Sequence, residues 1–181
     1  MSPPTERRPA PRRGFQRERG IGVVEVLVAV LLLSFGFLAA ARMQVQSLRF
    51  SQTASHRSQA FFMATDMIDR MRSNTAGAVG GAYDGLETSA STADPGCGER
   101  ACDGTEIARQ DLHDWSGRLH ADEANAEFVP ALPSATGIPA VGTVDRVADG
   151  VYRVTVRWAE PEGDGYTGAS LSMSFATEVP G

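Results

Sequence analysis

The feature that most constrains this chain is one carboxylate at the start of a long uncharged segment. Glu25 follows the junction Gly20-Ile21-Gly22 and precedes sixteen residues without a charge, Val26 to Ala41. Residues 21–41 would measure about 31 Å as a helix, which is enough to cross the apolar core of a bilayer. An unpaired carboxylate at the centre of such a helix costs roughly 3 kcal/mol on the insertion scale. We therefore expect Glu25 to have a functional role and to meet a positive charge.

The distribution of charge indicates how this segment crosses a membrane. Residues 1–20 hold six arginines and two glutamates, a net of +4, which leaves −9 for the rest of a chain whose total is −5. A cationic flank stays in the cytoplasm, so the chain after Arg42 is expected on the far side of the inner membrane. An acidic exported domain is a poor binder of phosphate backbones, so no direct nucleic-acid partner is expected.

The junction resembles the processing site of type IV prepilins. In that family a basic leader ends at a glycine, an apolar residue begins the mature chain, and a glutamate occupies mature position five; here these are Gly20, Ile21 and Glu25. Gly22 and Val23 depart from the family's more usual polar-then-leucine pair. The resemblance implies that a prepilin peptidase cleaves after Gly20 and methylates the new amine of Ile21. It also implies that Glu25 attracts the Ile21 amine of an adjacent subunit during assembly.

Two other interpretations of the apolar segment stay open. It has the length of a plain signal anchor. It also has the form of a secretory signal, with an apolar core at Val26 to Leu38 and a small-residue cleavage site at Ala39-Ala40-Ala41. Glu25 argues against the secretory signal, because an acid at the head of the apolar core gains nothing in a segment destined for removal.

The apolar segment is predicted to continue as one long helix. No glycine or proline occurs between Arg42 and Gly77, so the helix is expected from about Ile21 to Asn74, on the order of 80 Å. Its first half must then pack on something outside its own domain, which in pilins is the same helix of other subunits. An apolar stripe in one heptad frame is predicted for the second half: Met43, Phe50, Ala54, Phe61, Ala64, Ile68 and Met71, interrupted by Ser47 and Arg57.

Two short stretches resemble the PilV family of minor type IV pilins. One is the end of the long helix, Arg70-Met71-Arg72-Ser73-Asn74, where the spacing also predicts ion pairs from Asp66 to Arg70 and from Asp69 to Arg72. The other is the cysteine pair followed by Asp111-Leu112 and Trp115. A generic charged helix end is the alternative interpretation of the first stretch.

Cys97 and Cys102 are expected to form a small structural disulfide, because the exported side is oxidising. A metal site with His113 and His120 is conceivable, but the spacing fits no common zinc motif. A redox pair would prefer two intervening residues. A helix is predicted to follow, with its apolar face at Ala108, Leu112, Trp115 and Leu119 and with Asp103 or Thr105 as its cap.

The rest of the chain is predicted to be loops and strands. Residues 75–95 are rich in small residues and are expected to form a loop, with a turn at Tyr83-Asp84-Gly85. Alternating residues predict strands at 152–158 and 171–175, joined by a turn at 161–165, with a weaker strand within 141–147. The expected fold class is α+β and pilin-like, with the long N-terminal helix packed on a C-terminal antiparallel sheet.

The sequence shows no catalytic constellation, and no enzyme, cofactor or metal is expected. The resemblance implies a minor type IV pilin with a leader (1–20), a transmembrane half-helix (21–41), an amphipathic half-helix (42–74) and a globular head (75–181). Its implied partners are major and minor pilins, prepilin peptidase, the inner-membrane assembly machinery and membrane lipid. The alternatives are a minor pseudopilin of a type II secretion system, a signal-anchored exported binding domain and an envelope enzyme.

Overall fold

The computed structural model describes residues 22–89, 91–120 and 129–177. Contacts divide the chain into two units, Met1–Val45 and Gln46–Gly181. Helix α1, Val23–Ser73, contributes to both. All described residues of the first unit are exposed, and from Val23 onward they are helical.

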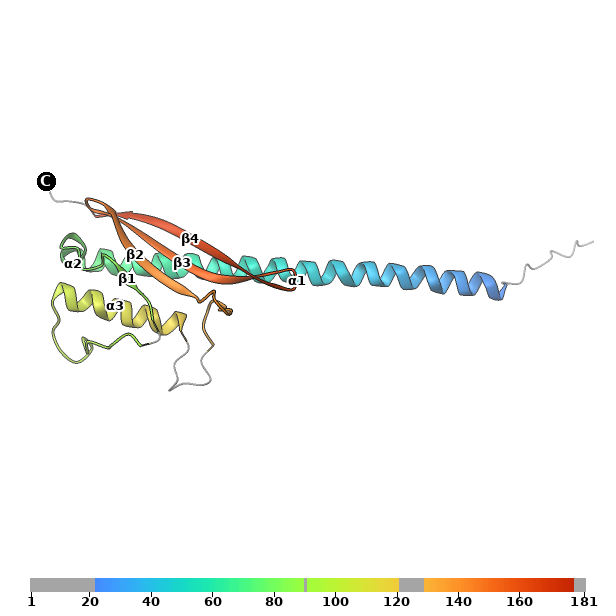
Figure 1. Ribbon diagram of the computed structural model, residues 1–181, viewed down its shortest axis with the longest axis horizontal. Helices are drawn as coiled ribbons and strands as arrows, with labels where there is room; N and C mark the ends of the chain where they lie inside the picture. Colours follow the sequence, from blue (N-terminus) through green and yellow to red (C-terminus); the bar gives the residue numbers. More distant parts are fainter. Residues whose placement is uncertain (1–21, 90, 121–128, 178–181) are drawn as a thin grey trace, which may run out of the picture. The chain divides into compact units, whose positions relative to one another are not determined.

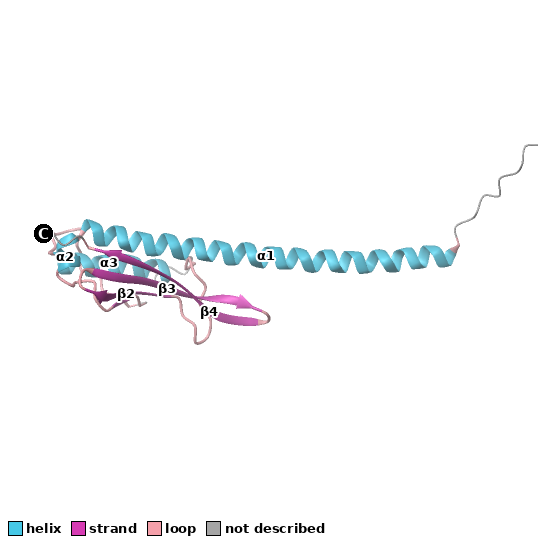
Figure 2. Cartoon of the chain, turned by 90° about the horizontal axis from the view of Figure 1, so that it is seen from above, coloured by secondary structure: helices cyan, strands magenta, loops and turns pink. Residues whose placement is uncertain are grey.

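The second unit, which we call the head, is an α+β domain with one meandering sheet. The strands lie in the order β1-β2-β3-β4, and every neighbouring pair is antiparallel (Figures 1 and 2). The predicted architecture, a long N-terminal helix on an antiparallel sheet, is therefore confirmed. Besides α1, its elements are α2 (Thr75–Val79), β1 (Leu86–Glu87), α3 (Gly104–Leu119), β2 (Val141–Ala148), β3 (Val151–Glu162) and β4 (Gly165–Ala176).

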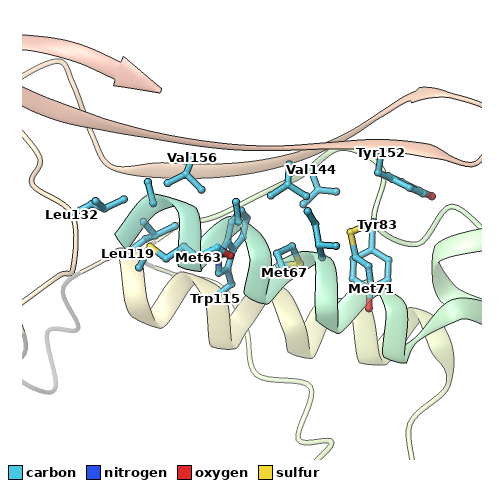
Figure 3. Packing of buried hydrophobic residues seen from close by; sticks show 14 of the residues in the cluster. Met63, Met67, Met71, Tyr83, Trp115, Leu119, Leu132, Val144, Tyr152 and Val156 are labelled. Carbon is cyan, nitrogen blue, oxygen red and sulfur yellow. Dashed lines mark hydrogen bonds between the residues drawn. The ribbon is translucent and has the colours of Figure 1, made fainter. Parts of the chain in front are cut away.

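The core lies between the sheet and two helices, the last turns of α1 and the whole of α3 (Figure 3). Trp115 of α3 is fully buried and donates its indole N–H to the carbonyl of Met63 at 3.2 Å. Its ring also lies against β2, where a Cβ added to Gly142 would overlap the ring. Trp115 thus contacts α1 and the sheet from α3. The predicted apolar face of α3 is buried at this contact.

The strand predictions hold, but the hairpin is longer than the sequence indicated. β3 and β4 pair without a register shift from Val151↔Ala176 to Glu162↔Gly165. Pro161 and Glu162 were expected in the turn and instead belong to β3, leaving Gly163 and Asp164 between the strands. Gly163 has a φ of +58°, a left-handed conformation that glycine adopts freely and that suits a two-residue hairpin turn.

Two other predictions need correction. Residues 75–95 contain a short helix, α2, and the two-residue strand β1, where only a loop was expected. The predicted heptad stripe is buried only at Ala64, Ile68 and Met71, because the buried face of α1 has shifted to Ala60, Met63 and Met67. Phe50 and Phe61 of the stripe are 67% and 47% exposed. Residues of α1 are buried only from Ala60 onward. The tip of the β3–β4 hairpin still reaches an earlier turn, where Arg49 donates to the Gly163 carbonyl at 3.2 Å, but it leaves Phe50 exposed.

Helix α3 begins as predicted from its capping residue. The Asp103 carboxylate accepts hydrogen bonds from the backbone N–H groups of Thr105 and Glu106 at 2.9 and 2.8 Å. Glu106 completes a capping box by accepting from the Asp103 N–H, and Arg100 binds the Glu106 carboxylate at 2.8 Å. These contacts fix the start of α3 directly after the cysteine pair.

Replacing Gly142 by alanine should destabilise the head, because the added methyl group overlaps the Trp115 ring. Overpacking of this kind costs about 1–3 kcal/mol. Urea unfolding of the full-length chain in detergent, followed by tryptophan fluorescence, measures the loss.

Gly117→Ala is the matched control, because Gly117 lies on α3 and a methyl group added there would meet no atom within 4 Å. Alanine is the better helix former by about 1 kcal/mol, so this variant should be neutral or more stable. Equal unfolding curves for the two variants would contradict the close packing of Trp115 on β2.

Candidate assembly site

The N-terminal part of α1 exposes a continuous apolar surface. The large hydrophobic side chains from Val23 to Val45 are between 51% and 78% exposed. By length and composition this helix can cross a membrane. An apolar surface of this extent is typical of a membrane or protein contact, because water does not favour it. The described residues therefore leave this surface free for lipid or for other chains.

Glu25 lies in the first turn of α1 and is exposed. Its backbone N–H donates to the carbonyl of Gly22 at 2.9 Å, which starts the helix. A carboxylate in a first turn is favoured by the positive end of the helix dipole. Within the described part of the chain its side chain has no ion pair. Gly20 and Ile21, the predicted cleavage and methylation positions, lie outside the described residues.

The other end of α1 is fixed to the head by a cluster of charged groups around Arg70. The Arg70 guanidinium contacts Asp66 on the preceding turn at 3.0 Å, as the sequence predicted. It also reaches Asp111 at 3.2 Å and Asp114 at 3.1 Å, both on α3. The predicted pair between Asp69 and Arg72 is present too, but it is exposed on both sides. Arg70 is therefore more than a charged helix end, because it bridges two helices.

A chain of buried hydrogen bonds continues from Asp111 into the loop after α1. Asp111 accepts from the hydroxyl of Tyr83 at 2.5 Å, and that hydroxyl accepts from the Asn74 amide at 3.0 Å. The Asn74 amide also donates to the Gly104 carbonyl at 2.7 Å, while its oxygen accepts from the N–H of Gly77. Asn74 thus caps α2 and holds the first residue of α3. We call Arg70, Asn74, Tyr83 and Asp111 the junction network.

Burial shapes the acid–base behaviour of this network. Burial, reinforced by the hydrogen bond to Asp111, raises the pKa of Tyr83 far above its ordinary value. Burial by itself lowers the pKa of Arg70, but its bonds to Asp66, Asp114 and Asp111 outweigh this and the net pKa is raised. Tyr83 is thus held neutral and Arg70 charged, the states that the observed hydrogen bonds require.

Sequence reasoning identified part of this network and missed the rest. Arg70, Asn74 and Asp111 lie in the two stretches whose resemblance to PilV-type minor pilins was noted, and the structure brings those stretches into contact. Tyr83 was expected only in a turn. The sequence did contain a sign of its role, because Tyr83 is an aromatic residue in a segment otherwise made of small residues. Such a residue tends to be buried with its hydroxyl group hydrogen-bonded.

The structure joins Cys97 to Cys102 in a disulfide. The two histidines considered as metal ligands have other roles: His113 pairs with the carbonyl of Thr92 at 2.9 Å, and His120 with the hydroxyl of Thr88 at 3.0 Å. Among the residues with described positions, no group of three or more histidine, cysteine or acidic side chains is placed to hold a metal ion.

Comparison with known proteins places this geometry in a class. Residues 42–113 match the model of the Tt1218-like family, described as Type IV pilin Tt1218. No curated protein and no solved structure matches the chain. The matched range contains all four residues of the junction network. Together with the long apolar helix and the four-stranded antiparallel sheet, the match supports a type IV pilin, which is a structural and not an enzymatic class. The disulfide and the apolar helix fit a membrane-anchored pilus protein.

Replacing Arg70 by alanine should destabilise the head far more than the same change at Arg72. Arg70→Ala leaves the buried carboxylate of Asp111 beside Tyr83 without its cation. Removing one partner of a buried pair costs about 3–5 kcal/mol, which the partial exposure of Arg70 reduces to about 2 kcal/mol. Arg72 pairs with Asp69 in the open and lies 5.3 Å from the ring centroid of Phe175, so its loss should cost under about 1 kcal/mol. Chemical unfolding of both full-length variants gives the comparison. Equal losses would show that the junction network does not hold α1 to α3.

Proposed function

We propose that this chain is a minor type IV pilin that prepilin peptidase cleaves after Gly20 and that enters the pilus through its N-terminal helix. The observation that carries the proposal is the uncovered apolar part of α1 with Glu25 in its first turn. A plain anchor needs the apolar surface but has no use for the acid. A subunit of a helical bundle needs both.

The physical role proposed for Glu25 follows from the charges that cleavage creates. A cut after Gly20 leaves the amine of Ile21 four residues from Glu25, at the same end of the helix. In an apolar bundle neither charge is solvated, so each is costly alone and strongly attracted to the other. Pairing Glu25 of one subunit with the Ile21 amine of its neighbour therefore fixes the register of adjacent helices, and methylation leaves the amine basic.

The mature subunit would wait in the inner membrane with its new amino terminus at the cytoplasmic side and the head in the periplasm. It would then join major and minor pilins and help to prime or modify assembly for motility, adhesion or DNA uptake. A minor pseudopilin of a type II secretion system would share the helix and Glu25. The resemblance of residues 70–74 and of the disulfide region to PilV-type pilins favours the pilus.

The first test is the amino terminus and mass of the protein in envelope and sheared-filament fractions. The proposal requires a chain that begins at Ile21 and carries one added methyl group. A chain that begins at Arg42, or one that keeps Met1, would overturn it and leave an exported domain on a signal sequence or a plain anchor.

The second test separates processing from assembly. Glu25→Ala should leave cleavage largely intact but lower the amount of subunit in sheared pili roughly tenfold or more, because a buried, unpaired amine costs about 3–5 kcal/mol. Glu99→Ala, which removes an exposed acid of the head, serves as the control and should change neither step. Immunoblots of membranes and sheared filaments measure both. Equal incorporation of the Glu25 variant and the wild type would contradict the proposed role of Glu25 in assembly.

A further inference from the structure

Strands β3 and β4 have one face toward the core and one face away from it (Figure 3). Side chains alternate between the two faces of a strand, and the buried residues Val154 and Val156 mark the core side of β3. The opposite side is formed by the odd-numbered side chains of β3 and by their partners, the even-numbered side chains of β4. We call this side of the two strands the outer face.

Along the middle of the outer face, each β3 side chain is an arginine or a threonine, and each β4 partner is a serine. The three pairs are Arg153↔Ser174, Thr155↔Ser172 and Arg157↔Ser170. Both arginines and all three serines are exposed. Four residues of extended strand separate the two arginines, which is about 13 Å. The outer face therefore presents two cations on one line, each with a hydroxyl group beside it.

The acids of the chain leave these two arginines available. Residues 21–181 carry twenty acids and eleven arginines. On the outward side of the described strands β2, β3 and β4, the one acid is Asp145, which the register places opposite Arg153. Neither Arg153 nor Arg157 forms an ion pair with a described residue. A cationic line on an otherwise acidic chain points to an anionic ligand.

A hollow of about 380 Å³ borders the Arg157 end of the outer face. It is lined by Arg157 and Trp158 of β3, by residues 168–170 of β4 and by the turn at residues 137–139. Arg157 is the one charged residue in this lining, and Ser170 adds a hydroxyl group. Ligand pockets measure about 300–1,000 Å³, so this hollow suits a small group such as one sugar unit.

The turn gives the hollow a fixed apolar wall. The backbones of Ala135 and Ile138 exchange two hydrogen bonds, each 2.9 Å long. Gly137 between them has a φ of +77°, a left-handed conformation that glycine adopts freely. The Ile138 side chain reaches β4, where its Cγ2 atom is 3.9 Å from the position that a Cβ on Gly168 would occupy. A ligand group would thus meet a surface that is already formed, which lowers the cost of binding.

The open edge of β4 adds backbone donors beside the hollow. The strand order places no described strand on the other side of β4. The N–H of Thr177 donates to the carbonyl of Gly150, directly beyond the last pair of β3 and β4. Bonded and non-bonded pairs alternate in an antiparallel ladder, so the even-numbered residues of β4 direct their N–H and C=O groups outward. Gly168 and Ser170 are two of these residues and also line the hollow.

We propose that the outer face binds an acidic polysaccharide, whose uronic acid carboxylates pair with Arg153 and Arg157 and of which one sugar unit enters the hollow. A linear polymer with repeated carboxylates fits two cations on one line, and its hydroxyl groups fit the serines beside them. Guanidinium–carboxylate contacts are charge-assisted and therefore strong among hydrogen bonds. This binding does not depend on the function proposed above, but its use as an adhesive contact of a pilus rests on that function.

Nucleic acid, another linear polyanion, suits the outer face less well. Its affinity for proteins comes from many phosphate contacts, and two arginines on residues with a net charge of −9 provide few. Binding of single strands also uses several aromatic side chains for stacking. Tyr166 is the one aromatic side chain on the outer face of the described strands.

Biolayer interferometry of the full-length chain in detergent, on immobilised polygalacturonate, tests the proposal. We expect saturable binding that weakens at high salt, and no binding to neutral dextran. Polyglutamate and single-stranded DNA serve as competitors, because they are polyanions without the sugar acid. A competitor that displaces the chain as well as soluble polygalacturonate does, at equal charge concentration, would overturn the assignment to a polysaccharide. The absence of saturable binding would overturn it too.

Arginine variants locate the site. Arg153→Ala and Arg157→Ala should each lower the affinity roughly two- to tenfold, which is typical of one exposed charge-assisted contact. The double variant should show the product of the two losses, because distant sites act independently. Arg109→Ala is the matched control, since it removes an exposed arginine from α3 and changes the net charge equally. Equal affinities of the Arg157 and Arg109 variants would show that the outer face is not the site.

An added acid tests the hollow while leaving both arginines in place. Ser170→Asp puts a carboxylate beside Arg157 and should lower the affinity by a similar factor, roughly two- to tenfold. Ser91→Asp adds the same charge at an exposed residue far along the chain and should bind like the wild type. Wild-type affinity of the Ser170 variant would remove the hollow from the proposal. Absence of the chain from sheared filaments would instead overturn the proposed function and leave the binding result unchanged.

Discussion

The rest of the structure depends on one constraint: the chain buries only a small part of its own helix α1. The helix has 51 residues, and all of its buried ones lie between Ala60 and Met71. Burying a large apolar side chain is worth about 1.5–3 kcal/mol, so the exposure of an apolar helix of this length to water is strongly unfavourable. A membrane, or apolar helices of other chains, would bury this surface. The head, which has its own core, must therefore be attached to a helix that it buries only in part.

The junction network solves the attachment with few residues. Arg70 holds α1 to α3 through Asp111 and Asp114, while Asn74 and Tyr83 tie the chain just after α1 to the start of α3. No buried side-chain polar atom of this cluster lacks a hydrogen-bond partner among the described residues. This is the condition under which buried polar groups give a unique arrangement without a large penalty. Trp115 adds apolar area at the same place and bonds the α1 backbone through its indole. The family match to a type IV pilin covers this region and β1, but not strands β2 to β4.

The sequence predicted the elements that obey local rules. The α3 cap, the disulfide loop, the strands around Val154 and Met173, and the single long helix each depend on short-range periodicity or on chemistry within a few residues. Predictions that depend on tertiary packing were less accurate. The heptad frame identified Phe50 and Phe61 as part of the buried stripe, yet the head meets α1 on a face shifted toward Met63 and Met67, and periodicity alone cannot choose between neighbouring faces.

The exposed part of α1 and the open edge of β4 differ in what they can recognise. Apolar side chains on a helix pack against many partners with similar energy, so the exposed part of α1 suits entry into a bundle whose members share that helix. In the proposed function, Glu25 would set the register of adjacent helices but would recognise only an amine, which every cleaved subunit would carry. Choice among partners must then come from groups with direction. The open edge of β4 has such groups, because its outward N–H and C=O groups can pair only with an extended backbone.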